Sequence, residues 1–317
     1  MTAPFLHQPV MADEVVELFR PVPPGVLLDA TIGGGGHARR LLEARPDLRI
    51  LGLDRDPKAL AAAGAELAPF GDRVTLIRSR FDHLGQIMSD LAIDELSGAL
   101  FDLGVSSPQL DEPDRGFSYR WDAPLDMRMD PDDPWSATDV VNGYPEAELT
   151  HLLAAYGDER YARRIAHAIV EARPIESTAE LAGIVANAIP AAARRRRGHP
   201  AKRTFQAIRI EVNRELDILP ATIDDAVSAL APGGRIAVLS YHSGEDRIVK
   251  DRLRQAETGG CTCPPGLPCV CGAIATVRLL KRGGWTPSTA EKAANRRAES
   301  ARLRAAERLA PPLEVSE

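Results

Sequence analysis

Val26-Leu27-Leu28-Asp29-Ala30-Thr31-Ile32-Gly33-Gly34-Gly35-Gly36-His37 is the most informative run of residues in this 317-residue chain. A short apolar segment ends at Asp29, passes through four glycines and continues into an amphipathic segment at 38–44. This order predicts a strand, a tight turn and a helix, the first unit of an α/β nucleotide-binding sheet. Glycine has no Cβ, so its backbone can turn sharply and let a ligand approach the helix N-terminus. The turn also fits the pattern Gly-x-Gly-x-x-Ala, so alone it does not separate NAD from another adenosine-containing cofactor.

The bulk properties are those of a soluble enzyme. The length suits about two domains, each with its own core. Hydrophobic residues make up 44% and charged residues 26% of the chain, and no apolar run approaches the roughly 20 residues that a membrane span needs. Residues 1–9 have neither the basic start nor the apolar stretch of a secretory signal. We therefore expect a cytoplasmic protein without membrane contact.

The charge is unevenly distributed. A net charge of −6 argues against a protein that coats nucleic acid without specificity. The segment 160–214 is nevertheless basic, with Arg160, Arg163, Arg164, Arg173, the four arginines at 194–197, Lys202, Arg203, Arg209 and Arg214. Charge alone leaves two interpretations open, a phosphate-binding face and an ordinary solvated helix surface.

Further strands follow the glycine turn. We predict them at 50–53, 74–77, 98–103, 235–240 and 274–280, with helices between most of them. The carboxyl ends of such strands are where open α/β sheets bind ligands. Asp54 stands about 20 residues beyond the glycines, where an acidic residue holds ribose hydroxyls, although a strand-end turn residue is the alternative. Phe81 either flanks an adenine ring or belongs to the core.

The alternation of strand and helix lapses in the middle of the chain. We expect a loop at 111–135 and helices at 146–156, 159–172 and 178–188. A strong helix is predicted at 204–219 and another at 222–230, while the tail from 291 is expected to be helical or frayed and exposed. The chain therefore divides into a sheet domain, 1–109 with 204–317, and an inserted helical domain, 110–203.

Four cysteines lie within eleven residues, as Cys261-x-Cys263-(x5)-Cys269-x-Cys271. They do not form the disulfide framework of a small secreted domain. Four thiols would suit tetrahedral zinc, but the usual spacing within a pair is two to four residues, and here it is one. We expect reduced thiols and no metal.

Several motifs occur together in one chain. They are Asp29-x-Thr31-x-Gly33-Gly34-Gly35-Gly36-His37, Asp54-Arg55-Asp56-Pro57, Asp102-Leu103-Gly104-Val105-Ser106-Ser107-Pro108-Gln109, Arg115-Gly116-Phe117-Ser118, Pro124-Leu125-Asp126-Met127-Arg128-Met129, Arg203-Thr204-Phe205-Gln206 and Ser240-Tyr241-His242-Ser243-Gly244-Glu245-Asp246-Arg247. This set closely resembles the MraW (RsmH) family of bacterial 16S rRNA cytidine N4-methyltransferases. The resemblance runs from His7 to about Arg304. The chain departs from the common pattern at Ala38, at Gly244 and in the tail at 295–300, and none of these positions is a cofactor residue that the resemblance implies.

The resemblance implies a class I, Rossmann-like methyltransferase sheet that uses S-adenosylmethionine, with an inserted all-helical, RNA-recognition domain. The implied substrate is 16S rRNA, within the small ribosomal subunit, at the decoding-centre cytidine conventionally numbered 1402. The implied cofactor residues are Gly33, Gly35, Gly36, His37, Asp54, Phe81, Asp102 and Gln109. A homodimer is compatible with the sequence, which does not fix the oligomeric state.

The chemistry needs positioning and hydrogen-bond acceptors. The cytosine amine is a poor nucleophile, so N4 must be held in line with the activated methyl group, and its hydrogens need acceptors as the nitrogen becomes tetrahedral. We expect Asp102, Ser106 and Ser107 to accept them. His242 either contacts the base or caps a helix. The flipped base is expected to stack on Phe117, Tyr119 or Trp121.

Two other functions fit parts of the pattern. The glycine turn also allows an NAD-dependent oxidoreductase. A non-catalytic ribosome-assembly factor that keeps a cofactor pocket is the second alternative, although the intact Asp54 and Asp102 argue against it.

Overall fold

The computed structural model describes residues 9–105, 109, 112–191, 199–264 and 270–311, which form two compact units. The first unit comprises Met1–Gly104 and Leu216–Glu317, and the second comprises Val105–Glu215. The expected boundaries, after 109 and before 204, therefore lie 5 and 12 residues from those of the structure. Residues 202–213 belong to the helical unit because Phe205, Ile208 and Val212 are buried in its core.

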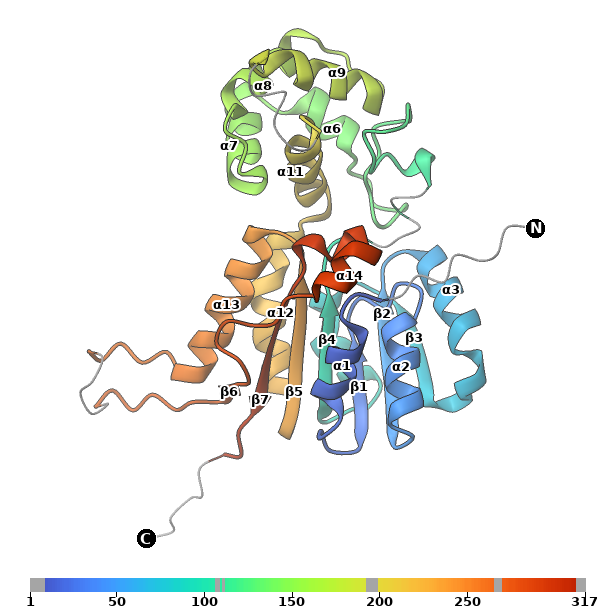
Figure 1. The fold of residues 1–317 in the computed structure, drawn as a ribbon, viewed down its shortest axis with the longest axis vertical. Helices are drawn as coiled ribbons and strands as arrows, with labels where there is room; N and C mark the ends of the chain where they lie inside the picture. The colour runs from blue at the N-terminus through green and yellow to red at the C-terminus, as the bar shows by residue number, and fades with distance from the viewer. Residues whose placement is uncertain (1–8, 106–108, 110–111, 192–198, 265–269, 312–317) are drawn as a thin grey trace. The chain divides into compact units, whose positions relative to one another are not determined.

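The first unit contains a seven-stranded sheet with the order β3-β2-β1-β4-β5-β7-β6 (Figure 1). The strands are β1 (Gly25–Asp29), β2 (Leu48–Asp54), β3 (Val74–Arg78), β4 (Leu96–Asp102), β5 (Leu230–Ser240), β6 (Val277–Leu279) and β7 (Arg302–Arg308). β1 to β5 pair in parallel, whereas β7 runs antiparallel to both β5 and β6. This confirms the predicted fold class, a Rossmann-like methyltransferase sheet with a helical insertion. A strand inserted between the fifth and sixth also departs from the order 3-2-1-4-5-6 of dinucleotide-binding sheets.

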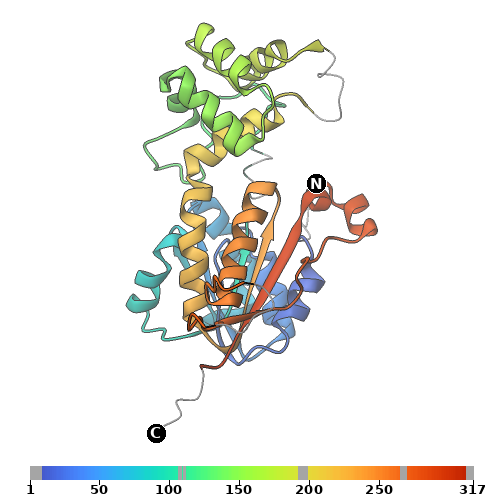
Figure 2. The same cartoon turned by 90° about the vertical axis from the view of Figure 1, so that its left-hand side faces the viewer.

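Helices cover both faces of this sheet (Figures 1 and 2). They are α1 (Ala12–Phe19), α2 (Gly36–Ala44), α3 (Pro57–Leu67), α4 (Leu84–Asp90), α12 (Glu215–Ala229) and α13 (Ser243–Thr258). A further short helix, α14 (Thr289–Ala294), contains no buried residue. Successive strand residues point to opposite faces, so Leu27 packs in the core beneath α1 and α2 while Leu28 packs in the core beneath α4 and α12. Because both faces are buried, the central strands β1 and β4 are largely apolar runs without alternation.

The glycine turn has the predicted strand–turn–helix form. β1 ends at Asp29, and α2 begins at Gly36 after the N-cap residue Gly35. Gly33 and Gly35 have φ angles of 51° and 83°, a left-handed conformation that glycine adopts without strain. A Cβ on Gly35 would also lie 3.2 Å from Leu67 Cγ. The turn therefore needs glycine at both places.

The C-terminal tail corrects one expectation. Residues 302–308 are not helical, frayed or exposed but form β7, and Leu303, Ala305 and Ala306 are buried. Arg304 inside this strand pairs with Asp246 at 2.6 Å. Its Ala, Arg and Glu residues favour helix by propensity, and the tertiary packing on both sides overrides that preference.

The second unit is helical. Its helices are α6 (Ala137–Gly143), α7 (Glu146–Gly157), α8 (Ala162–Glu171), α9 (Thr178–Ala188) and α11 (Lys202–Asn213). The predictions at 146–156 and 178–188 are confirmed, while α6 was not predicted. Its signal was present, since Ser136 and Asp139 form a capping box at its start.

The predicted helix at 204–219 is two helices. α11 ends before Arg214, which has a left-handed backbone with φ 52°, and α12 begins at Glu215 and continues through Pro220. Arg209 Nε donates to Glu215 Oε1 at 2.8 Å across this junction. The break therefore lies at Arg214, not at 220–221 between the two predicted helices. In the part of the chain that the structure describes, no helix is long and apolar enough to cross a membrane.

Candidate active site

Asp54 lies at the end of β2 and closes the glycine turn. Its Oδ2 accepts a hydrogen bond from Gly33 N at 3.0 Å, and its Oδ1 accepts one from Asp56 N at 2.9 Å. Burial raises the pKa of the Asp54 carboxyl, against the lowering effect of these two donors. Asp56 itself caps α3 by accepting from Lys58 N. The predicted pairing of Asp54 with the glycine turn is therefore present, through a direct hydrogen bond.

His37, in the first turn of α2, approaches Asp102, the last residue of β4. His37 Nε2 lies 3.6 Å from Asp102 Oδ2. His37 is buried, and neither of its ring nitrogens has a hydrogen-bond partner among the described residues. Thr31 fixes the backbone here, since its Oγ1 accepts from Asp102 N at 2.7 Å. Buried polar atoms without partners are costly, so His37 is suited to a polar ligand.

Tyr241 is a site residue that the sequence analysis did not single out. Its hydroxyl donates to Asp102 Oδ1 at 2.6 Å. Burial and the neighbouring Asp102 carboxylate raise the pKa of this phenol well above its ordinary value, so it remains a donor at neutral pH. The available signal was its place directly after β5, at the carboxyl edge of the sheet.

Asp29 is a second residue of this kind. Its carboxyl is buried at the end of β1 and accepts from Thr31 N at 3.3 Å. Burial raises its pKa to about 7, His37 acts in the opposite direction, and the carboxylates of Asp102 and Asp54 raise it further. Three carboxyl groups thus meet at one edge of the sheet, an arrangement that favours a positively charged ligand.

Phe81 and His242 both contact other residues of the sheet unit. The Phe81 ring meets Phe101 edge to face, with centroids 5.8 Å apart, so it packs on the core, and its contact with adenine stays a prediction. His242 is the N-cap of α13, and its Nδ1 accepts from Glu245 N at 3.4 Å. Its Nε2 lies 3.0 Å from Glu245 Oε1, without the geometry of a hydrogen bond. Both nitrogens face Glu245, which supports the helix-cap interpretation.

The other predicted residues lie elsewhere. Ser106 and Ser107 are outside the described residues. Gln109 belongs to the second unit, where it is buried, and its contact with the cofactor stays a prediction. Gly36 begins α2 directly after the glycine turn.

The chain matches the model of the MraW methylase family over residues 4–309. The chain belongs to this family. Two relatives are each named ribosomal RNA small subunit methyltransferase H. The Heliobacterium modesticaldum protein is 51% identical over 311 residues, 96% of this chain and 99% of its own length. The Thermobifida fusca protein is 53% identical over 313 residues, 96% of this chain and 94% of its own length.

Among solved structures, a putative rRNA methylase from Clostridium thermocellum is similar with a TM-score of 0.43 and 14% identity, over 96% of this chain and all of its own. The family membership comes from the sequence match. It confirms the resemblance drawn from the motifs, and it sets aside both the oxidoreductase and the non-catalytic assembly factor.

The three aromatic candidates for base stacking differ in this MraW-family chain. Phe117 is buried in the core of the helical unit, so the expectation that it stacks a base is wrong. Tyr119 already stacks on His199, with centroids 4.3 Å apart. Trp121 is 54% exposed. Of the three, Trp121 is the one with a ring open to a nucleobase.

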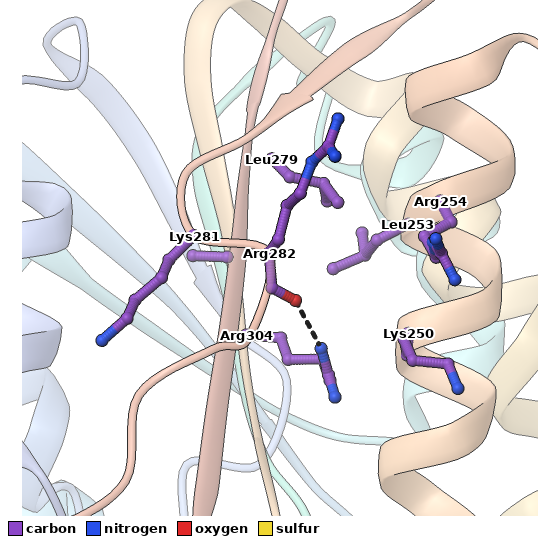
Figure 3. A pocket seen from close by; sticks show the side chains of 8 residues that line it. Lys250, Leu253, Arg254, Leu279, Lys281, Arg282 and Arg304 are labelled. Atoms are coloured by element: carbon purple, nitrogen blue, oxygen red, sulfur yellow. Dashed lines mark hydrogen bonds between the residues drawn. The ribbon is translucent and has the colours of Figure 1, made fainter.

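A second group of cationic side chains lines a hollow in the sheet unit (Figure 3). Lys250 and Arg254 come from α13, Lys281 and Arg282 follow β6, and Arg304 comes from β7. Arg304 is held in place, since it donates to Arg282 O at 3.3 Å and pairs with Asp246. None of the predicted cofactor residues lines this hollow.

Proposed function

We propose that this chain transfers a methyl group from S-adenosylmethionine to N4 of a cytidine in 16S rRNA of the small ribosomal subunit, in the cytoplasm. The observation that carries the proposal is the pairing of His37, at the start of α2, with Asp102 at the end of β4, beside the glycine turn that Asp54 closes, in an MraW-family chain. The names of the relatives support the substrate, small-subunit rRNA.

The residues at this edge fit the cofactor. Each Asp54 oxygen accepts one backbone N–H and keeps a lone pair for a ribose hydroxyl. The buried His37 nitrogens can bind the polar methionine end. The carboxyl groups of Asp29, Asp54 and Asp102 favour binding of the positively charged sulfonium and ammonium groups of the cofactor. When bound, S-adenosylmethionine supplies a methyl group that the sulfonium charge has already activated.

Asp102 is the residue that we assign to the cytosine amine. Tyr241 holds its Oδ1, and its side chain is about one quarter exposed, so it can accept a hydrogen bond from N4 as that nitrogen gains positive charge. Ser106 and Ser107 come four and five residues after the end of β4 at Asp102 and are proposed as further acceptors. We propose His242 as a helix cap and not as a proton acceptor; Tyr241 N donates to Glu245 Oε2 at 2.7 Å.

The RNA backbone is proposed to contact the basic surface of the helical unit. Arg160, Arg163 and Arg164 are exposed at the start of α8, and no ion pair involves them among the residues described. The arginines at 194–197 lie outside the described residues. We propose the cationic hollow of the sheet unit as a second phosphate contact. A homodimer stays a prediction, and light scattering on the purified chain tests it by measuring the molar mass in solution.

Methylation of isolated small subunits tests the proposal. The purified chain, a labelled methyl donor and subunits that lack the modification are combined, and the 16S rRNA is mapped by mass spectrometry. We expect N4-methylcytidine at a single position with the wild type and none with Asp102→Asn.

Tyr241→Phe removes a hydrogen bond to a charged group worth about 1.5–3 kcal/mol, so kcat should fall roughly 10- to 100-fold while KM for the subunit is unchanged.

The matched control is Asp251→Asn, which changes an exposed carboxyl on α13 that lies 3.6 Å from Lys250 Nζ. It should methylate at the wild-type rate. A wild-type chain that leaves every cytidine unmodified contradicts the proposed activity. Wild-type methylation by Asp102→Asn contradicts only the role assigned to Asp102.

A further inference from the structure

All four cysteines of the chain lie in one segment, between the end of α13 at Thr258 and the start of β6 at Val277. The described part of this segment contains no helix or strand. Structureless connections longer than about 12–15 residues are uncommon in compact domains. Val270 and Ile274 are 89% and 58% exposed, so burial of apolar side chains does not hold this segment in place.

Backbone contacts close the base of the segment. Thr276 N donates to Ala256 O at 2.9 Å, and Gly260 N donates to Gln255 O at 3.0 Å. Gly259 has a φ of 62°, and a Cβ on it would lie 2.4 Å from Ile274 O. The outgoing and returning limbs are therefore in direct contact at the base of the segment. This contact brings Cys261 opposite Cys271.

Three thiols converge just beyond this base. The sulfur atoms of Cys261, Cys263 and Cys271 all lie within 4.8 Å of one another, and those of Cys261 and Cys271 are 3.6 Å apart. Zinc–sulfur bonds of about 2.3 Å in a tetrahedron place two sulfurs about 3.8 Å apart, whereas a disulfide joins them at about 2.05 Å. The observed 3.6 Å is too long for a disulfide and is close to the separation of two zinc-bound sulfurs.

We propose that Cys261, Cys263 and Cys271 bind a zinc ion that fastens the two limbs of this segment together. Thiolates select thiophilic cations, and zinc is the one that serves as a redox-inert structural ion. We make this proposal on the three described thiols alone. Structural zinc takes four ligands, so the fourth is solvent or a donor outside the described residues.

This proposal reverses the expectation from spacing. A spacing of one residue strains the turn when both cysteines of a pair have to bind the metal from the same short turn. In the structure, Cys261 and Cys263 come from one limb and Cys271 from the other, so the ligand set is assembled by the contact at the base. The spacing within a pair is then no obstacle.

Metal analysis of the full-length chain, purified without chelator, tests the site. We expect one zinc ion per chain, lost in Cys261→Ser and in Cys271→Ser. Thr262→Ser, which alters the same limb and keeps every thiol, should retain it. Because the chain has no cysteine outside this segment, a thiolate-to-cobalt charge-transfer band in the cobalt-substituted protein can come only from here.

A second readout does not depend on the variants folding. Removing the metal from the wild type with a chelator should make 259–276 sensitive to protease and its thiols reactive, while the melting of the remaining fold is unchanged. Substoichiometric zinc after zinc addition and dialysis, with no cobalt–thiolate band, overturns the proposal. So does an unaltered zinc content in Cys261→Ser and Cys271→Ser, or thiols that react equally fast with and without chelator.

Discussion

Asp29 shows how a single buried carboxyl can tie stability to pH. Its pKa is raised from the ordinary 3.8 to about 7, mainly by burial. The folded chain therefore binds this proton more tightly than the unfolded chain does. The resulting stabilisation is complete below about pH 4 and is lost as the pH rises through 7. At one pKa unit per 1.36 kcal/mol it amounts to about 4 kcal/mol at most.

Asp29→Asn removes this dependence because the amide is neutral throughout and keeps an oxygen for Thr31 N. We expect the variant to melt at a higher temperature than the wild type at pH 8, and the difference to shrink or disappear at pH 5. Differential scanning calorimetry at both pH values measures it. Asp251→Asn, at an exposed carboxyl, serves as the control. Equal differences at the two pH values would contradict the raised pKa.

At the scale of secondary-structure elements, the side-chain amide of Asn213 joins α11 to the loop around Met129. Asn213, the last residue of α11, is buried. Its Oδ1 accepts from Met129 N at 2.8 Å, and its Nδ2 donates to Met127 O at 2.7 Å and to Arg209 O at 2.8 Å. One side chain therefore satisfies buried backbone groups of two separate segments.

Asn213→Ala should lower the free energy of unfolding by roughly 2–4 kcal/mol, since buried backbone groups lose their partner. Urea denaturation followed by circular dichroism measures the loss. Gln206→Ala on the same helix removes one hydrogen bond, to Tyr156 O, at a half-buried position and should cost less than about 1 kcal/mol. A smaller loss for Asn213→Ala than for Gln206→Ala would show that the junction is not held by this amide.

At the scale of the whole molecule, a net charge of −6 coexists with a basic surface on the helical unit. The proposed RNA contact therefore makes binding depend on salt through local arginines. Arg163→Gln and Arg164→Gln should each weaken binding to small subunits and reduce the slope of log affinity against log salt by about 0.7–0.9. Filter binding over a range of potassium chloride concentrations measures the slope. Arg20→Gln is the control, because Arg20 pairs with Glu17 at 2.7 Å. If Arg20→Gln reduces the slope as much as the other two substitutions do, the contact of Arg163 and Arg164 with RNA is not specific.

The sequence alone determined the parts of this protein that depend on near neighbours. The glycine turn and its hydrogen bond to Asp54 join residues 21 positions apart, within one strand–helix–strand unit whose pattern is local. The capping of α3 by Asp56 and the helices at 146–156 and 178–188 follow in the same way. The family motifs then identified the fold class and the reaction.

The tertiary structure decided whatever joins distant segments. Tyr241 and Asp102 are 139 positions apart, and only the pairing of β4 with β5 brings their strand ends together. β7 is a strand because both of its faces are covered, against the helical preference of its residues. The three thiols converge because the base of their segment is closed by backbone contacts. Such contacts depend on tertiary packing, and the pattern of residues along the chain does not predict which distant residues will meet.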